Sequence, residues 1–181
     1  MAFSVNQFRS QMTGDGARPN LFEVSMPFPG FANPGDAQQK LTFMCKTAQL
    51  PGSTIGTVPV QYFGREIKFA GNRTFADWSV TIINDEDFVI RNAFERWMNG
   101  MNSHQLNIRN PLALTPGGYT VDAEVRQFGK KGNTLKKYKF IGVFPTDISA
   151  IDVDWGSNDT IEEFTVNLSY QWWESVEDGV A

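Results

Sequence analysis

The stretch TIEEFTVNLSYQWWE, residues 160–174, alternates polar and apolar side chains along most of its length. The apolar members are Phe164, Val166, Leu168, Tyr170 and Trp172. A period of two is typical of a β-strand with one buried face, because successive side chains point to opposite sides of a sheet. The stretch therefore predicts one long strand whose apolar face lies in the core.

Strand and turn signals extend outward from this stretch over most of the chain. Residues 77–83 put Trp78, Val80 and Ile82 on one face, and residues 120–128 and 134–144 are typical of a hairpin around the turn GKKGN. Shorter strands are expected at residues 21–27, 41–50, 57–70, 105–109 and 148–154, with a bulge or bend at Gly64 and a turn at residues 71–73.

A helix is expected after the acidic stretch NDED, residues 84–87. An Asn or Asp of this stretch can cap the helix, and the remaining acids favour its positive end. One apolar stripe at helical spacing follows, made by Ile90, Phe94, Trp97 and Met101. Together these signals predict a mainly β fold of two packed antiparallel sheets, sandwich or barrel-like, with one flanking helix.

The domain organisation expected is simple. Residues 1–20 are an N-terminal arm, residues 21–174 a single β domain, and residues 175–181 a C-terminal tail. A chain of 181 residues fits one domain. The start of the sequence lacks the apolar run of a signal peptide, and no stretch is long and apolar enough for a membrane span.

The composition offers little for catalysis or metal binding. One Cys and one His exclude a disulfide framework and a Cys/His zinc site within one chain. His104 has no partnered nucleophile, and Cys45 is expected to be a small buried hydrophobe. Asp152, Asp154, Asn158 and Glu163 have the spacing of calcium ligands, but Ser157 stands where that loop requires glycine. We expect no catalytic residue, metal or cofactor, and no enzyme.

Charge is segregated along the chain. Six basic residues and no acid lie between Arg126 and Lys139, whereas residues 150–181 hold eight acids and no Lys or Arg. Two solvated faces are one interpretation. The other is a subunit with complementary sides, in which Lys136 and Lys137 contact a second copy and build a ring or a filament.

The second face of residues 160–174 is small and polar, and Asp77, Ser79 and Thr81 resemble it. It comprises Glu163, Thr165, Asn167, Ser169 and Gln171. A wall without positive charge suits DNA that must pass without sticking, because a basic wall would bind the phosphates. Ordinary exposure to water explains the same pattern.

Several strings resemble the tail tube proteins of contractile-tailed, T-even-like bacteriophages. They are ARPNLFEV (17–24), FMCKTAQLPG (43–52), KFAGNRTFADW (68–78) with NDE (84–86), and FPTD (144–147), followed by Asp154, Trp155 and positions up to Glu174. The resemblance covers about residues 17–174. It implies a subunit of six-membered rings with a continuous inner β-barrel, and rings that stack into a tube inside a contractile sheath.

The resemblance also implies partners and a location. These are further copies of the chain, the sheath protein, baseplate tube-initiator proteins, the tape measure protein and the tail terminator. Genome DNA would pass through the lumen without sequence-specific binding. The protein would belong to the virion and assemble in the cytoplasm of the bacterial host.

Inter-ring contacts are expected from apolar residues that have no place in the core pattern. They are Phe3, Val5 and Phe8 of the arm, and Leu50, Pro51, Ile55 and Val58 of the loop expected at residues 50–58. Alternative functions are the inner tube of a tailocin, of a type VI-like system or of an extracellular injection machine, and a baseplate tube initiator. A jelly-roll surface-binding module is a different class, and it would need Phe28 and Phe31 exposed.

Overall fold

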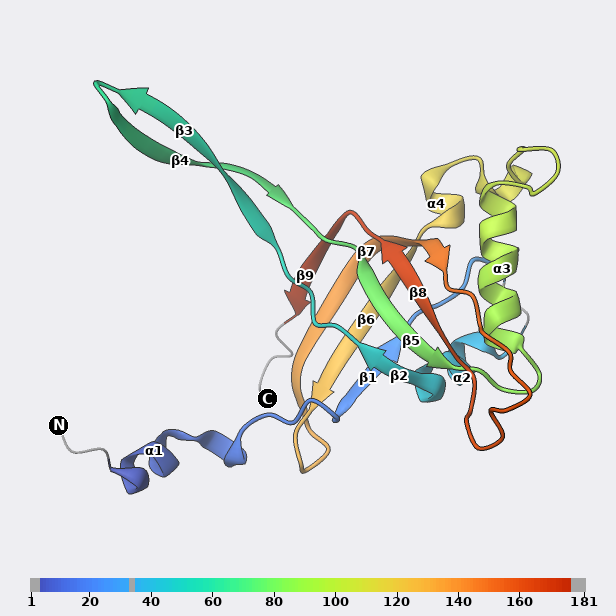
Figure 1. The fold of residues 1–181 in the computed structure, drawn as a ribbon, viewed down its shortest axis with the longest axis horizontal. Coiled ribbons are helices and arrows are strands. Elements are labelled where there is room, and N and C mark those ends of the chain that lie inside the picture. The colour runs from blue at the N-terminus through green and yellow to red at the C-terminus, as the bar shows by residue number, and fades with distance from the viewer. Residues whose placement is uncertain (1–3, 33–34, 177–181) are drawn as a thin grey trace.

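The computed structural model describes residues 4–32 and 35–176. Two antiparallel sheets pack face to face, and a separate two-stranded hairpin projects from them (Figure 1). The first sheet holds β1 (Phe22–Ser25), β6 (Val121–Phe128), the first part of β7 (Thr134–Ile148) and β9 (Trp172–Val176). The second holds the end of β7, β8 (Glu163–Ser169), β5 (Trp78–Ile83) and β2 (Cys45–Ala48). The predicted fold class is confirmed.

Strand β7 belongs to both sheets. Its first part pairs with β6 and β9, and residues 144–148 pair with β8. Gly142 lies at the transition with a φ of 68°, a conformation that side chains with a Cβ rarely adopt, and its N–H donates to Asp122 Oδ1 at 3.2 Å. The two sheets are therefore joined through one continuous strand.

Aromatic rings fill the space between the sheets. Trp78 of β5 stacks on Phe140 of β7 with ring centroids 4.2 Å apart. Around them lie the alternating residues of β5 and β8, all buried as their period predicted: Val80, Ile82, Phe164, Val166 and Leu168.

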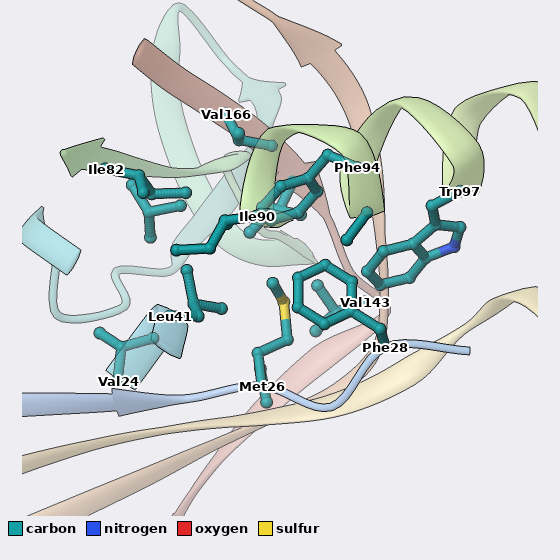
Figure 2. Close-up of a cluster of buried hydrophobic side chains, with 14 of the residues drawn as sticks. Val24, Met26, Phe28, Leu41, Ile82, Ile90, Phe94, Trp97, Val143 and Val166 are labelled. Atoms are coloured by element: carbon teal, nitrogen blue, oxygen red, sulfur yellow. The ribbon is translucent and has the colours of Figure 1, made fainter. Parts of the chain in front are cut away.

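Helix α3 (Val89–Met101) carries the predicted stripe into the core. Ile90, Phe94 and Trp97 are buried and point toward Phe28 and the inner strands (Figure 2). The expectation of an Asn or Asp cap is wrong, because the N-cap is Phe88 with a φ of 53°. Asp87 lies one residue earlier and accepts from Val89 N–H at 3.1 Å.

A second helix, α2 (Ala37–Met44), occupies the start of the segment expected to be a strand at residues 41–50. Within residues 41–50, only β2 (Cys45–Ala48) is a strand. Ala37 and Leu41 lie one helical turn apart and are both buried, so core packing favours the helix. Lys40 of α2 forms ion pairs with Asp85, at 2.7 Å, and with Asp87, which ties α2 to the start of α3.

Three further expectations are wrong in detail. The strand at residues 57–70 is a hairpin, β3 (Thr54–Tyr62) and β4 (Arg65–Thr74), so residues 71–73 lie within a strand and the turn is at Phe63 and Gly64. Residues 160–174 are divided at Tyr170 and Gln171, where the chain leaves β8 for β9 in the other sheet, so Trp172 is exposed rather than in the predicted core face.

Residues 105–109 form a loop rather than a strand, and of the strand expected at residues 148–154 only Ile148 is in a strand, as the last residue of β7. In the first of these, Ser103 N–H donates to Ile108 O at 3.0 Å and Asn107 has a φ of 54°, which closes a tight loop. Short helical turns complete the chain: α1 (Val5–Gln11), η1 (Thr13–Asp15), η2 (Pro111–Ala113) and α4 (Pro116–Tyr119).

Candidate functional site

The described residues hold no cluster of three or more His, Cys, Asp or Glu side chains that could bind a metal. The single thiol is also unsuited to chemistry, because burial raises the pKa of Cys45 to about 12 and keeps it protonated. Among the helices of residues 4–32 and 35–176, none is long and apolar enough to cross a membrane. The candidate site is therefore a set of surfaces rather than a pocket with reactive groups.

The most prominent surface is the β3–β4 hairpin, which extends away from both sheets (Figure 1). Among the strands of the described chain, β3 and β4 pair only with each other. Every residue of β3 is exposed, and so is every residue of β4 except Gly71. The exposed large apolar side chains are Ile55, Val58, Val60, Tyr62, Phe63, Ile67 and Phe69.

The tip of the hairpin is aromatic. Phe63 is 92% exposed, has a φ of 46° and packs only edge-on against Tyr62, with ring centroids 4.6 Å apart. Gly64 follows with a φ of 81°, so both turn residues are left-handed. Asn–Gly is the pair that such a two-residue turn prefers, and phenylalanine is strained there.

The root of the hairpin is fixed to the body by two indole N–H groups. Trp78 Nε1–H donates to Gln49 O at 3.0 Å, and Trp173 Nε1–H donates to Gly52 O at 3.1 Å. Leu50 and Pro51 lie between these two anchors. The projection is thus held at its base while its length stays free of the body.

The sequence-predicted contact residues fall on this hairpin and on the N-terminal arm. Ile55 and Val58 lie on β3, half exposed. The sequence pattern does not predict the apolar residues of β4 and the tip, because Gly64 is also typical of a bulge within one strand; a turn at Gly64 would have placed them on a hairpin. In the arm, Val5 and Phe8 lie exposed on α1 at a spacing of three residues, whereas Phe3 lies outside the described residues.

The predicted polar face is assembled from two adjacent strands. Thr165 Oγ1 lies 3.2 Å from Thr81 Oγ1, and Asn167 is in register with Ser79. Ser169 continues this face along β8.

Two members of the polar face differ from the expectation. Glu163 forms a 2.6 Å ion pair with Lys46, so the face carries one cation at its end. Gln171 lies outside β8, at the bend before β9, where its N–H donates to Ile141 O at 3.0 Å.

The basic segment is largely neutralised within the chain. Lys137 Nζ lies 3.0 Å from Glu124, and Lys139 Nζ lies 2.9 Å from Asp122. Partial burial raises the pKa of Glu124, but hydrogen bonds from Lys137 and Arg126 outweigh that effect and hold it below its usual range. Lys136 is half-buried, and no ion pair is recorded for it among the described residues.

The positions of Phe28 and Phe31 test the alternative of a surface-binding module. It is buried, edge-on to Phe94 at 5.1 Å and to Trp97 at 5.8 Å between ring centroids. Phe31 packs against the same core. The exposed aromatic pair that a surface-binding module would need is therefore not formed by these residues.

These surfaces define a class of protein, a structural subunit whose exposed apolar projections can be buried only by other molecules. The chain belongs to the phage tail tube protein family, whose sequence model matches residues 17–176. Membership places it among structural proteins rather than enzymes.

A relative of similar sequence supports that assignment, and solved structures share the fold. The tail tube protein gp19 of Enterobacteria phage T4 is 35% identical over 167 residues, covering 92% of this chain and 96% of the relative. Among solved structures, a chain of the anti-feeding prophage baseplate has a TM-score of 0.65 and 14% identity, covering 91% of this chain and 98% of that one. A chain of the sheath–tube complex of an extracellular contractile injection system has a TM-score of 0.54 and 17% identity, covering 97% and 99%.

Proposed function

We propose that the chain is the repeating subunit of a phage tail tube, a component of the virion. Copies assemble into rings of six, and the rings stack into a hollow tube that conducts the genome inside a contractile sheath. The observation that carries this proposal is the β3–β4 hairpin, which exposes seven large apolar side chains while its strands pair with no other strand of the described chain.

Most of the apolar surface of the hairpin is left unburied by the subunit itself. An isolated two-stranded hairpin is marginally stable in water, and contiguous exposed apolar surface is characteristic of a binding interface. Strands of nine and ten residues with exposed faces on both sides need a partner. A second copy in the next ring supplies one, and repetition of that contact builds a tube.

The polar face of β5 and β8 suits the wall of the lumen. The hydroxyl groups of Thr165 and Thr81 hydrogen-bond with each other, and Asn167 Nδ2–H donates to the carboxylate oxygen Oδ2 of Asp147 on β7 at 3.4 Å. The one cation at its end, Lys46, is neutralised by Glu163. Such a wall offers phosphates no free cation, so DNA would slide rather than bind.

Relatives support the choice of particle and of partners. The 35% identity to a T4 tail tube protein favours a phage over a dedicated injection machine. Folds shared with chains from a baseplate and from a sheath–tube complex support contacts with baseplate initiators and with the sheath. The tape measure protein and the tail terminator complete the proposed set of partners.

The decisive experiment removes the hairpin and keeps the body. Residues 56–72 are replaced by an Asn–Gly turn, which leaves Ile55 opposite Arg73 to close a short hairpin. We expect the wild-type protein to form hollow tubes in negative-stain electron microscopy, and the shortened protein to keep its melting temperature and circular dichroism without forming tubes. Tubes of wild-type appearance from the shortened chain would contradict the proposal.

The lumen assignment has its own test. Asn167→Lys together with Ser169→Lys should leave folding intact and slow DNA ejection from virions that carry the variant. The control is Gln39→Lys, which adds a cation at an exposed position of α2, an element that is not part of the polar face. Ejection at the wild-type rate in the double variant would contradict the assignment of this face to the lumen.

A further inference from the structure

The loop between β7 and β8 presents an apolar side chain among acids. Trp155 is completely exposed (101%), and Val153 and Ile161 of the same loop are exposed as well. Hydrogen bonds within the loop give it a defined turn, since Asp154 Oδ1 accepts from Gly156 N–H at 3.0 Å and Asp154 O accepts from Ser157 N–H at 3.1 Å. Trp155 thus stands on a shaped loop with its whole indole in water.

Three carboxylates of this loop are not paired with a cation of the described chain. Among the described residues, no ion pair is recorded for Asp152, Asp154 or Asp159. The loop is accordingly an anionic surface with a large apolar centre. A partner that fits it needs a hollow for the indole and cations at the edge.

A surface of that description lies on the same chain, after the C-terminal end of α3. A hollow of about 380 Å³ is lined there by Phe31, Arg96, Gly100, Leu106, Ile108 and Arg109. Its size is within the range of small-ligand pockets and is sufficient for one indole. Leu106 and Ile108, which line the hollow, are 70% and 61% exposed, and Leu112 and Leu114 are exposed a few residues further along the chain.

The hollow also carries the complementary charge. Within the described part of the chain, neither Arg96 nor Arg109 has a recorded ion pair. Arg109 lies over the ring of Tyr119, 5.6 Å from its centroid, which orients the guanidinium. Charged pairs of this kind steer docking and fix its register.

The two surfaces lie at opposite ends of α3. In Figure 1 the β7–β8 loop is beside the N-terminal end of the helix, and the segment after α3 is at the other end. One chain therefore cannot bring its own loop to its own hollow. Two different, complementary surfaces at opposite ends allow a head-to-tail contact between copies, which can repeat in one direction as a stack.

We propose that the β7–β8 loop of one copy docks on a second copy, with Trp155 in the hollow after α3 and the loop carboxylates on Arg96 and Arg109. This contact rests on the proposed tube and adds a second axial contact to that of the hairpin. Removal of a central interface aromatic typically weakens binding by roughly 30-fold or more, so we expect that loss of stacking affinity for Trp155→Ala.

A disulfide test identifies the contact directly. In a Cys45→Ser background, Val153→Cys and Ile108→Cys are combined while Trp155 is kept, and mild oxidation is followed by non-reducing electrophoresis and peptide mass spectrometry. We expect a ladder of covalent oligomers joined between positions 153 and 108. Each single-cysteine variant is the matched control and can form dimers only.

The outcomes separate this contact from the tube itself. Tubes that contain no 153–108 linkage, or Trp155→Ala tubes that form at wild-type concentrations, overturn the contact and leave the tube function standing. Trp155→Ala tubes that form normally but fail to bind sheath assign the loop to a different partner and also overturn it. A wild-type chain that stays monomeric at every concentration overturns both proposals.

Discussion

Replacing Phe63 with Asn separates folding of the hairpin from its role in assembly. Phe63 occupies a left-handed turn position, where a residue other than glycine costs about 1–2 kcal/mol and asparagine costs less. Its phenyl ring is 92% exposed, so the substitution removes almost no packing from the subunit. We expect Phe63→Asn to stabilise the turn by about 0.5–1 kcal/mol.

The same substitution, Phe63→Asn, should weaken assembly. Burial of a phenylalanine side chain is worth about 1.5–3 kcal/mol, and all of it is lost at each hairpin contact. With one hairpin for each of the six subunits proposed in a ring, the loss per ring reaches roughly 10 kcal/mol or more. A gain in turn stability therefore accompanies a large loss in stacking.

Two measurements resolve the two effects. Trypsin cleavage at Arg65 and Lys68 reports the order of the hairpin, and sedimentation with electron microscopy reports tube formation. Phe63→Leu is the control, because leucine keeps an apolar tip with similar backbone strain and should assemble almost as the wild type does. Wild-type assembly of Phe63→Asn, or faster cleavage of its hairpin, would refute the reasoning.

Three further predictions concern the body of the subunit. Trp97→Phe removes the 2.7 Å hydrogen bond from Nε1–H to Tyr119 O, and urea unfolding should show a loss of about 1–2 kcal/mol. Hydrogen bonds from Lys40 lower the pKa of Asp85 below its usual value, so this stabilisation is present above about pH 4 and is lost as pH falls through the lowered pKa. Lys40→Met should therefore flatten the decline of melting temperature at acid pH; an unchanged decline would contradict this. Cys45 is partly buried and has a pKa of about 12, so it should react with a thiol reagent at about pH 8 far more slowly in the native protein than after unfolding; equal rates in the two states would contradict this.

The sequence predicted those parts of the fold whose burial comes from the chain itself. β5, β8 and α3 show clear periods because one face of each meets the subunit's own core. The division of residues 160–174 was missed because the period of two continues through Tyr170 while the chain changes sheet. The helix α2 was missed because its two buried residues, Ala37 and Leu41, make too short a stripe for periodicity to identify.

The candidate surfaces were predictable only in part, for a related reason. The hairpin has no inward face, so its apolar residues follow no pattern set by the core, and only Ile55 and Val58 of β3 were identified. The polar face of β8 was identified because it is the complement of a buried face. Lys46, which neutralises Glu163, comes from a distant segment that no local pattern connects to it.

Strand β7 has a mechanical consequence. Because its backbone runs through both sheets, the sheets cannot slide past one another unless covalent bonds bend or the ladder to β6, β8 or β9 breaks. Compression of the subunit would otherwise make the two sheets slide past each other, and the continuous strand β7 resists this sliding. When a stack of such subunits is compressed along its axis, the projecting hairpins between neighbouring copies would deform first. Each two-sheet body would transmit the force with little deformation.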